Sequence, residues 1–342
     1  MLVHLDGFDS YSVVADLAME YGNISNVSFS TSTGRFGGGM AHVGASGMGG
    51  LTKALGATTT EFWVGFAAKF GVLSTTYPSG IIEFQSGAGI EFAVCITNGL
   101  FTLHLGRSGD TIVQNSVSVP QGMVLGGWQF LEIRYKYGAS AGVVEVWVNG
   151  VQCVTYSGNT AHMSGGSILQ LVIPGTRNSG MSEIYLDDLY IIDVAAGGAN
   201  TTRLGDCRIA TLLPTGNSTN QATPSAGSAY TCVNEAQWNT SNYVTFTPYA
   251  AGMIEDYTLG SLPSTPTAVF GVRVLAIADK SDAGSAGLCP YVNSGGTTAL
   301  GTGQPLSTSW GHIAGVFEVD PHTSAAWTTA AVNAMICGVE TV

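Results

Sequence analysis

The chain has 342 residues, 47 of them glycine, and Asp, Glu, Lys and Arg together make up only 10% of it. Its 11 basic and 23 acidic residues give a net charge of −12, which argues against binding to a nucleic-acid phosphate backbone. A surface so poor in charge is covered by hydroxyls, amides and backbone. That composition is typical of a β-protein with many tight turns and of a subunit that is buried against its neighbours.

Three further observations limit the possibilities. Residues 1–6 have no basic leader, apolar run or small-residue cleavage site, so we expect no secretory signal and synthesis in a cytoplasm. No stretch approaches the roughly 18–20 apolar residues of a membrane-spanning helix, so we expect no membrane insertion. The cysteines form no C-x-x-C pair and no cluster with histidine, so we expect reduced thiols, no metal site and no cofactor. They are Cys95, Cys153, Cys207, Cys232, Cys289 and Cys337.

Strict alternation of apolar and other residues is the strongest signal in the first half of the chain. Residues 61–70 place large apolar side chains on one face, and residues 131–137 repeat the pattern with Leu131, Ile133 and Tyr135 opposite Glu132 and Arg134. In 61–70 the apolar face holds Phe62, Val64, Phe66, Ala68 and Phe70, and the opposite face holds Glu61, Gly65, Ala67 and Lys69. Both segments are therefore predicted to be strands with one face in a core.

Two Asn-Gly pairs predict β-hairpins. Asn98-Gly99 joins strands at 91–96 and 100–105, and Asn149-Gly150 joins strands at 143–148 and 151–156. A two-residue type I′ turn needs positive φ at both central positions, which Asn followed by Gly tolerates best. With further strands at 81–85, 111–117, 168–173 and 184–193, the first part of the chain is predicted to be an antiparallel sandwich.

The small-residue stretch 194–200 follows the last strong strand and predicts a domain boundary. We expect one domain at 1–196 and a second, smaller β-sandwich at 197–342. The second domain has predicted strands at 207–213, 229–233, 243–247, 269–278 and 310–319. A short helix is expected within 322–335, capped by Thr323 or Ser324, with Trp327, Ala331 and Ala334 on one side.

A series of short motifs resembles tailed-bacteriophage virion structural proteins that carry a concanavalin A-like (LamG-like) jelly roll. In the first domain these are DGFDSY at 6–11, GRFGGG at 34–39, Trp128, VNG at 148–150 and DDLYI at 187–191. In the second they are LGDCR at 204–208, LPT at 213–215, VNE at 233–235 and DPHTSAAWTTAAVNA at 320–334. The resemblance lies in the order of the pieces and covers nearly the whole chain.

The resemblance implies an all-β chain of two β-sandwich domains, the first a concanavalin A-like jelly roll and the second a smaller sandwich with one short helix. It also implies a non-enzymatic tail, baseplate or capsid-decoration component of a virion, made in the host bacterial cytoplasm. Its expected partners are other virion proteins and copies of itself, as a homotrimer. The alternative is a host-recognition module that binds surface glycan, and the third hypothesis is a glycan-degrading enzyme.

Catalytic spacing was sought in 183–193, because glycosidases with a similar sandwich carry two catalytic carboxylates on one strand with a third between them. Glu183, Asp187 and Asp193 share a face by parity, but Tyr185 and Leu189 fill the positions where neighbouring carboxylates are needed. We therefore predict no catalytic residues here. Asp187-Asp188 is expected to bond loop backbone at the rim of the sandwich, with a divalent cation as the alternative.

Other candidate features have structural interpretations. The glycine-rich stretch 34–50 lacks the Gly-Lys-Ser/Thr of a phosphate loop, so we expect close backbone packing with Phe36 as an anchor. Ser46 misses the G-x-S-x-G nucleophile elbow by one position. His104 lies beside Thr102 on the polar face of its strand and is expected to face solvent or an interface.

Tryptophan side chains can bind sugars or anchor protein interfaces, and the sequence alone does not separate the two uses. Trp147 shares a face with Glu145, opposite Val146, so it is expected to be exposed or to contact another subunit. Trp128 and Trp327 are expected in the core.

Overall fold

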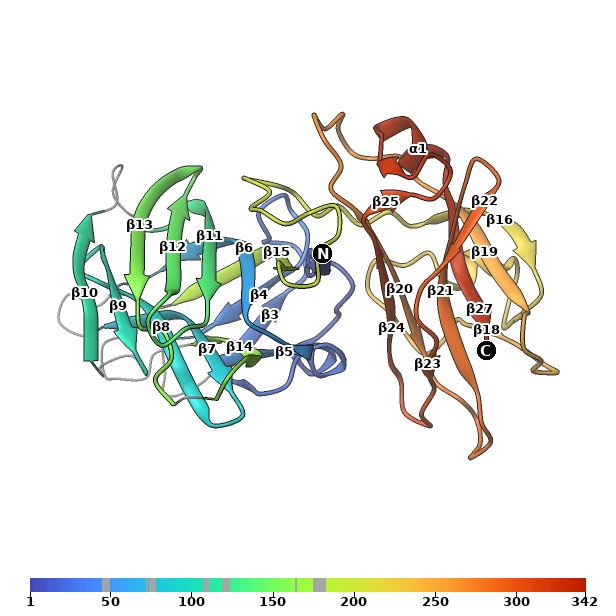
Figure 1. Cartoon of the computed structure of the whole chain (residues 1–342). Helices are drawn as coiled ribbons and strands as arrows, with labels where there is room; N and C mark the ends of the chain where they lie inside the picture. The colour runs from blue at the N-terminus through green and yellow to red at the C-terminus, as the bar shows by residue number, and fades with distance from the viewer. Residues whose placement is uncertain are drawn as a thin grey trace. The chain divides into compact units, whose positions relative to one another are not determined.

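The computed structural model describes residues 1–44, 50–71, 73, 78–106, 111–118, 124–163, 165–174 and 183–342 (Figure 1). The chain forms two compact units. The first contains Met1, Asp6–Asp9 and Val13–Ile209, and the second contains Leu2–Leu5, Ser10–Ser12 and Ala210–Val342. Within these ranges, no helix is long and apolar enough to cross a membrane.

The first unit is a jelly-roll sandwich of two antiparallel sheets, which confirms the predicted all-β fold class (Figure 1). Sheet A runs in the order β13 (Val151–Gly158), β12 (Gly142–Val148), β11 (Trp128–Lys136), β6 (Glu61–Phe70), β15 (Ile184–Asp193), β4 (Met40–Val43) and β3 (Val27–Ser30). Sheet B runs in the order β10 (Thr111–Ser118), β9 (Leu100–Leu105), β8 (Gly89–Thr97), β7 (Ser79–Ser86), β14 (Ile168–Pro174), β5 (Gly50–Thr59) and β2 (Ile24–Ser25). The 3-10 helix η1 (Val14–Met19) also belongs to this unit, whereas strand β1 (Leu2–Asp6) is divided, with only Asp6 in the first unit.

Aromatic side chains fill the space between the two sheets. Tyr135 of β11 stacks on Phe84 of β7 with ring centroids 4.3 Å apart, and Phe62 of β6 lies 5.3 Å from Phe84. The apolar face predicted for residues 61–70 is fully buried, which confirms the alternation. The opposite face of sheet A, called here the outer face, carries the alternate residues of the same strands.

Both predicted hairpins are present. Asn98 and Gly99 have φ of 49° and 74° between β8 and β9, and Asn149 and Gly150 have φ of 49° and 79° between β12 and β13. Positive φ at both central positions is what a type I′ turn requires. The Asn149 side chain also accepts a hydrogen bond from the Phe130 backbone N–H at 2.8 Å, which ties the turn to β11.

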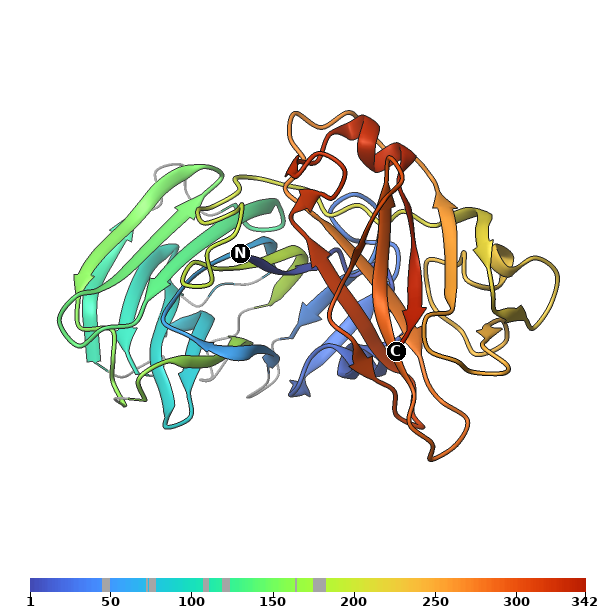
Figure 2. The same cartoon turned by 45° about the vertical axis from the view of Figure 1, so that its right-hand side comes forward.

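The second unit contains one main sheet and a separate two-stranded ribbon (Figure 2). The main sheet runs in the order β16 (Pro214–Asn220), β19 (Ile254–Leu259), β27 (Ile336–Thr341), β21 (Gly287–Ser294) and β22 (Thr297–Leu300), with β23 (Gln304–Pro305) also paired to β21. The ribbon consists of β20 (Val272–Ala278) and β24 (Gly311–Phe317). Two short pairs are β17 (Thr223–Pro224) with β18 (Val244–Thr245), and β25 (Val319–Asp320) with β26 (Ala325–Ala326).

Several strand predictions in the second unit are wrong. Residues 207–213 have no regular structure, and Ala229–Cys232 form the 3-10 helix η2 where a strand was expected at 229–233. Only Val244–Thr245 of 243–247 is a strand. The apolar residues in these segments produced a strand-like sequence pattern. Their backbone groups can instead form hydrogen bonds with side chains: the Tyr230 N–H donates to Asn217 Oδ1 at 2.7 Å.

The short helix is present but begins later than expected. Helix α1 spans Thr329–Ala334 and is capped by Thr328, whose Oγ1 accepts a hydrogen bond from Ala331 N–H at 3.0 Å. The expected cap Ser324 has φ of 55° and its N–H donates to the Asp320 carbonyl, so this part of the segment forms a turn. Trp327 precedes the helix and is buried, as predicted.

The region of the predicted domain boundary also differs from the expectation. The sequence assigns residues 197–209 to the second domain, whereas these residues group with the first unit in the structure. They do so because their backbone N–H groups bond buried carboxylates of sheet A: Gly205 donates to Glu132 and Ile209 donates to Asp188, both at 2.7 Å.

Candidate functional site

The outer face of sheet A carries rows of aromatic and charged side chains that run across neighbouring strands. Pairing places Trp147 beside Glu132, which in turn lies beside Gly65, and it places Glu145 beside Arg134 and Arg134 beside Trp63. Residues directly opposite each other on adjacent strands lie within side-chain contact distance. The strand register therefore brings together residues that are far apart in the sequence.

Arg134 joins two carboxylates from different strands. Its Nη2 lies 2.6 Å from Glu61 Oε1 on β6, and its Nη1 lies 2.7 Å from Glu145 Oε1 on β12. Lys136 Nζ is 3.9 Å from Glu61 Oε2. The opposite charges in this cluster neutralise one another. Because the side chains are partly exposed, they also remain hydrated.

Residues 203–209, called here the strap, cross the outer face and bury Glu132. This carboxylate is only 1% exposed and accepts hydrogen bonds from Tyr190 Oη and Gly205 N at 2.7 Å each. Arg203 Nη1 completes its environment at 2.9 Å. A buried carboxylate is stable only when paired and hydrogen-bonded, and here one strap residue supplies the charge and another supplies a donor.

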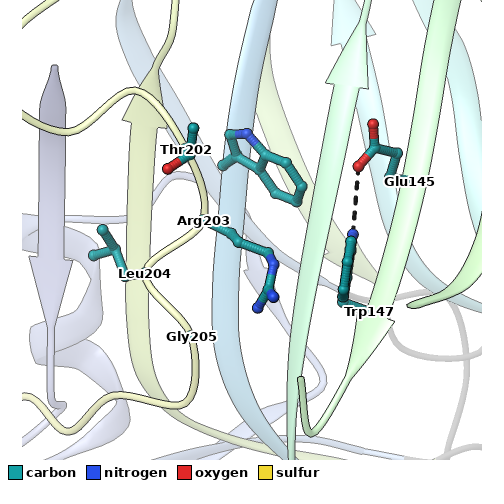
Figure 3. A pocket seen from close by; sticks show the side chains of 7 residues that line it. Glu145, Trp147, Thr202, Arg203, Leu204 and Gly205 are labelled. Atoms are coloured by element: carbon teal, nitrogen blue, oxygen red, sulfur yellow. Dashed lines mark hydrogen bonds between the residues drawn. The ribbon is translucent and has the colours of Figure 1, made fainter. Parts of the chain in front are cut away.

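An open depression of about 500 Å³ lies beside the strap (Figure 3). Figure 3 shows Arg203 extending toward Trp147, and the Arg203 Cζ lies 4.0 Å from the Trp147 ring centroid. The Trp147 indole N–H points to Glu145 Oε2 at 3.4 Å. The depression is lined by Trp63, Glu145, Trp147, Thr202, Arg203, Leu204 and Gly205.

This arrangement combines flat apolar rings with hydrogen-bonding groups of both kinds. The Trp147 indole offers aromatic area, with the buried Trp63 beneath the pocket lining, Glu145 offers acceptors, and Arg203 and Thr202 offer donors. Such a surface suits a ligand with an apolar face and hydroxyls at its rim. The depression, called here the tryptophan pocket, is the candidate functional site.

Sequence reasoning found part of this site. It placed Trp147 with Glu145 on an outward face, and the structure confirms that face; Trp147 is half-buried there beside Arg203. Trp63 was not singled out, although an aromatic residue opposite the apolar face of an alternating strand is a usable signal. Arg203 was missed because residues 197–209 were assigned to the second domain.

The Asp187-Asp188 pair bonds backbone at a bulge of β15, as predicted. Asp187 Oδ2 accepts from Arg35 N at 2.7 Å, and Asp188 Oδ1 accepts from Ile209 N at 2.7 Å. Burial, followed by the adjacent Asp188 charge, raises the pKa of Asp187 to about 8. Burial raises the pKa of Asp188 to about 6, against the opposing effects of the Ile209 N–H and Arg35. In the part of the chain that the structure covers, no group of three His, Cys, Asp or Glu residues could hold a metal ion.

The predicted common face of Glu183, Asp187 and Asp193 is wrong. Asp188 has φ of 51°, and the pairing of β15 with β6 shifts between Asp187 and Tyr190. Asp187 therefore pairs with Ala67 on the outer face, while Asp193 pairs with Phe62 in the core-facing row. The extra residue in the bulge inverts the parity on which the prediction depended.

In the described part of the glycine-rich stretch, Gly34 and Gly39 pack closely against backbone, as expected. A Cβ at Gly39 would collide with the Phe8 carbonyl, and one at Gly34 would lie 2.8 Å from Asp187 Oδ2. Phe36 is not a core anchor, because it is 51% exposed and lies beside the guanidinium groups of Arg35 and Arg208. Ser46 lies outside the described residues.

Two side-chain predictions are wrong. His104 is fully buried, not solvent-facing, and its Nε2 lies 3.0 Å from Thr102 Oγ1. His104 lies on the same face of sheet B as Glu83, and both side chains are buried. Polar residues at alternate positions of this strand therefore did not indicate a solvent-exposed face. Trp128 is half-buried on the outer face of sheet A beside Lys69, and does not belong to the core.

No family model matches the sequence, and no curated protein is similar to it in sequence. Solved structures with a similar fold include the cellulose-induced protein Cip1 (15% identity, TM-score 0.41, 59% of this chain and 93% of that one). Another is an endo-β-1,4-glucuronan lyase from the fungus Trichoderma reesei (15% identity, TM-score 0.36, 50% of this chain and 85% of that one). A third is the binding domain of Paraclostridial Mosquitocidal Protein 1 (12% identity, TM-score 0.40, 56% of this chain and 48% of that one). These likenesses concern the fold alone, and the three names mention no virus particle.

Proposed function

We propose that the chain is a saccharide-binding protein and that the tryptophan pocket of the first unit holds the sugar. The observation that carries the proposal is the juxtaposition of Trp147, Glu145 and Arg203 in one open depression. Pyranose rings present an apolar C–H face and a rim of hydroxyls, and the pocket offers a counterpart to each.

The hydrogen-bonding groups in the pocket are held in place before a ligand arrives. Glu145 is fixed by Arg134, and Arg203 is fixed by Glu132 and by the Trp147 ring. Arg203 uses Nη1 toward Glu132, which leaves other guanidinium N–H donors for a ligand. Side chains that are already ordered lose little conformational entropy on binding.

The charges around the pocket balance. Arg203 is paired with Glu132, and Arg134 lies between Glu61 and Glu145 with Lys136 close by. The whole chain carries a net charge of −12. A polyanionic chain would therefore gain little at this pocket, and a neutral saccharide is the ligand class that it fits.

A glycan array followed by calorimetry tests the proposal. We expect the protein to bind a group of neutral oligosaccharides, and Trp147→Ala to weaken that binding at least tenfold because it removes the ring and one of the two contacts that fix Arg203. Val143→Ala changes the same face of the same strand outside the pocket and is expected to bind normally. Absence of wild-type binding to neutral glycans, or equal binding by Trp147→Ala, would refute the proposal.

The proposal does not include catalysis. The neutral oligosaccharides that bind, and a glucuronate-containing oligosaccharide, should both be recovered unchanged after incubation with the protein. Reducing-end analysis detects hydrolysis, and absorbance near the ultraviolet band of an unsaturated uronate detects elimination from acidic saccharides. Turnover that persists in purified protein would show that the chain is an enzyme.

A second candidate function is that of a structural virion component in a tailed phage, acting through protein interfaces. It is favoured by the ribbon of β20 and β24, in which each strand buries only one residue, Val274 and Ile313, and leaves the others partly accessible. Arg273 is the one formally charged residue of these two strands, so their surface can be buried against another subunit with little desolvation of charge. The two functions are compatible, since a particle protein can also bind host glycan.

Antibody labelling of purified particles tests the structural role. We expect the antibody to label every particle at fixed positions on the tail, baseplate or capsid. Particles that lack the chain altogether would exclude this role without affecting the saccharide proposal.

A further inference from the structure

A second row of aromatic and basic side chains crosses the outer face of sheet A beyond the strap. Register places Trp128 of β11 beside Lys69 of β6, Lys69 beside Tyr185 of β15, and Tyr185 beside His42 of β4. All four are therefore neighbours across four adjacent strands. Lys69 is six residues from Trp63 along β6, which corresponds to roughly 20 Å, so this row is separate from the tryptophan pocket.

Lys69 lies between two aromatic rings. Its Nζ is 4.4 Å from the Tyr185 ring centroid and 5.2 Å from that of Trp128. Two other lysines of the same unit have carboxylate partners: Lys53 pairs with Glu20, and Lys136 lies 3.9 Å from Glu61. Over the described ranges, Lys69 forms no ion pair. The rings orient its ammonium group and leave its N–H donors without an acidic partner.

The other members of the row are fixed and do not neutralise Lys69. His42 stacks on Tyr185 with ring centroids 4.2 Å apart, and its Nδ1 lies 3.0 Å from Ser28 Oγ. Burial lowers the pKa of His42, while Glu183 opposes and Lys69 reinforces that change, so the ring is neutral at pH 7. Glu183, the nearby carboxylate, accepts a long hydrogen bond of 3.5 Å from Tyr185 Oη.

We propose that Trp128, Lys69 and Tyr185 form a second saccharide site, which takes a sugar that carries a carboxylate. The carboxylate pairs with Lys69 Nζ, and the apolar face of the sugar ring lies against the half-exposed indole of Trp128. Tyr185 Oη supplies a further polar group at the edge of the site. This site differs from the tryptophan pocket, where every nearby cation already has a carboxylate partner.

The choice of a carboxylated sugar follows from the two parts of the row. A small inorganic anion would use Lys69 but gain nothing from the Trp128 ring. A neutral sugar would use the ring but leave the ammonium group unpaired. Only a ligand with both an anionic group and an apolar ring face uses all three side chains.

Nuclear magnetic resonance of the tryptophan indole N–H groups tests the proposal on the full chain. The probes are a glucuronate-containing tetrasaccharide, a glucose tetrasaccharide of equal length and inorganic phosphate. We expect the glucuronate probe to shift the Trp128 indole signal at a concentration at least tenfold lower than the other two probes. Raising the salt concentration should weaken this binding.

Variants separate the roles of charge and fold. Lys69→Gln is expected to weaken glucuronate binding at least tenfold, and Lys69→Arg to retain it within about threefold. Lys136 lies on the same face and has its own carboxylate partner. The variant Lys136→Gln should therefore bind the glucuronate probe as the wild type does. A retained indole spectrum shows that each variant is folded.

Three results would overturn the proposal: equal response of Trp128 to the neutral and acidic probes, an equal response to phosphate, or unchanged binding by Lys69→Gln. Loss of neutral-sugar binding at Trp147 would leave this proposal standing, because its signal comes from Trp128. The two sites can therefore fail separately.

Discussion

Tyr190 shows how one glycine permits a buried contact in the first unit. The Tyr190 ring crosses β6 directly over Gly65, where an added Cβ would collide with the ring. Its hydroxyl thereby reaches Glu132 at 2.7 Å on the next strand and also accepts a hydrogen bond from Leu204 N at 3.1 Å. Gly65 is thus required by close approach, not by backbone conformation.

Gly65→Ala is expected to lower the free energy of unfolding of the first unit by about 2–4 kcal/mol. The methyl group displaces the Tyr190 ring and leaves Glu132 with fewer donors in a buried position. Chemical denaturation measures the change. Gly311→Ala is the control, since a Cβ there meets nothing within 4 Å, and its effect should stay within about 0.5 kcal/mol. Equal stability of the two variants would contradict this account of Gly65.

The raised pKa values of Asp187 and Asp188 give a direction for pH dependence. Both values lie above the roughly 3.9 of an aspartate in an unfolded chain, so the folded state binds more protons between about pH 4 and 8. The contribution of the pair to stability is therefore greatest below about pH 4 and is lost as the pH rises through 6 to 8.

Asp187→Asn removes one of these titrations and should make the loss of stability between pH 5 and pH 9 smaller than in the wild type. Denaturation curves recorded at pH 5, 7 and 9 provide the comparison. Asp282→Asn, an exposed residue of the second unit, should retain the wild-type profile. Parallel profiles for Asp187→Asn and the wild type would show that the pair does not titrate in this range.

At the scale of elements, the hairpin at Asn149-Gly150 depends on two positive φ angles. We expect the double variant Asn149→Ala, Gly150→Val to lower the stability of the first unit by about 1–3 kcal/mol, because both new side chains resist this conformation. Thermal unfolding checks the result. Asn149→Gly keeps the backbone freedom but removes the side-chain bond to Phe130, so it separates the two contributions. An unchanged melting temperature in the double variant would mean that the turn tolerates other residues.

The strands of the first unit could be predicted because their signal is local. Alternation in 61–70 and the Asn-Gly turns depend on neighbouring residues, and both were found in the structure. The strap could not be predicted, because residues 203–209 have no periodic pattern and are held by buried carboxylates of sheet A, among them Glu132, which lies 73 positions from Gly205. The bulge at Asp188 likewise depends on tertiary contacts, and it inverted the predicted faces of β15.

The candidate site was predictable only where it lies within strands. Trp147 and Glu145 were placed together on an outward face, since parity decides this. Arg203 is brought beside Trp147 only by the tertiary structure. Lys69 can be distinguished from the other basic residues only when the structure shows which of those residues have carboxylate partners. Trp128 was placed in the core because it is large and aromatic, although its parity with Glu132 and Arg134 puts it on the outer face, where the structure has it.

At the scale of the whole molecule, the low charge content and the partly accessible ribbon of β20 and β24 predict self-association. We expect a homo-oligomer, a trimer by the family resemblance, that does not require a metal ion. Light scattering at micromolar concentration, with and without chelator, should give a mass three times 35.3 kDa in both cases. A monomer would contradict the prediction, and dissociation by chelator would show that a metal ion holds the subunits together.

The central claim is that Trp147, Glu145 and Arg203 bind a saccharide, and the indole signal of Trp147 tests it most directly. In the full chain, the signal is assigned by its absence from Trp147→Phe. Titration with a neutral oligosaccharide selected on the array should shift the Trp147 signal saturably, while the signals of Trp327 and of the other tryptophans outside the pocket stay in place. Binding that leaves the Trp147 signal unmoved, or no saturable binding of any neutral oligosaccharide, would contradict the account.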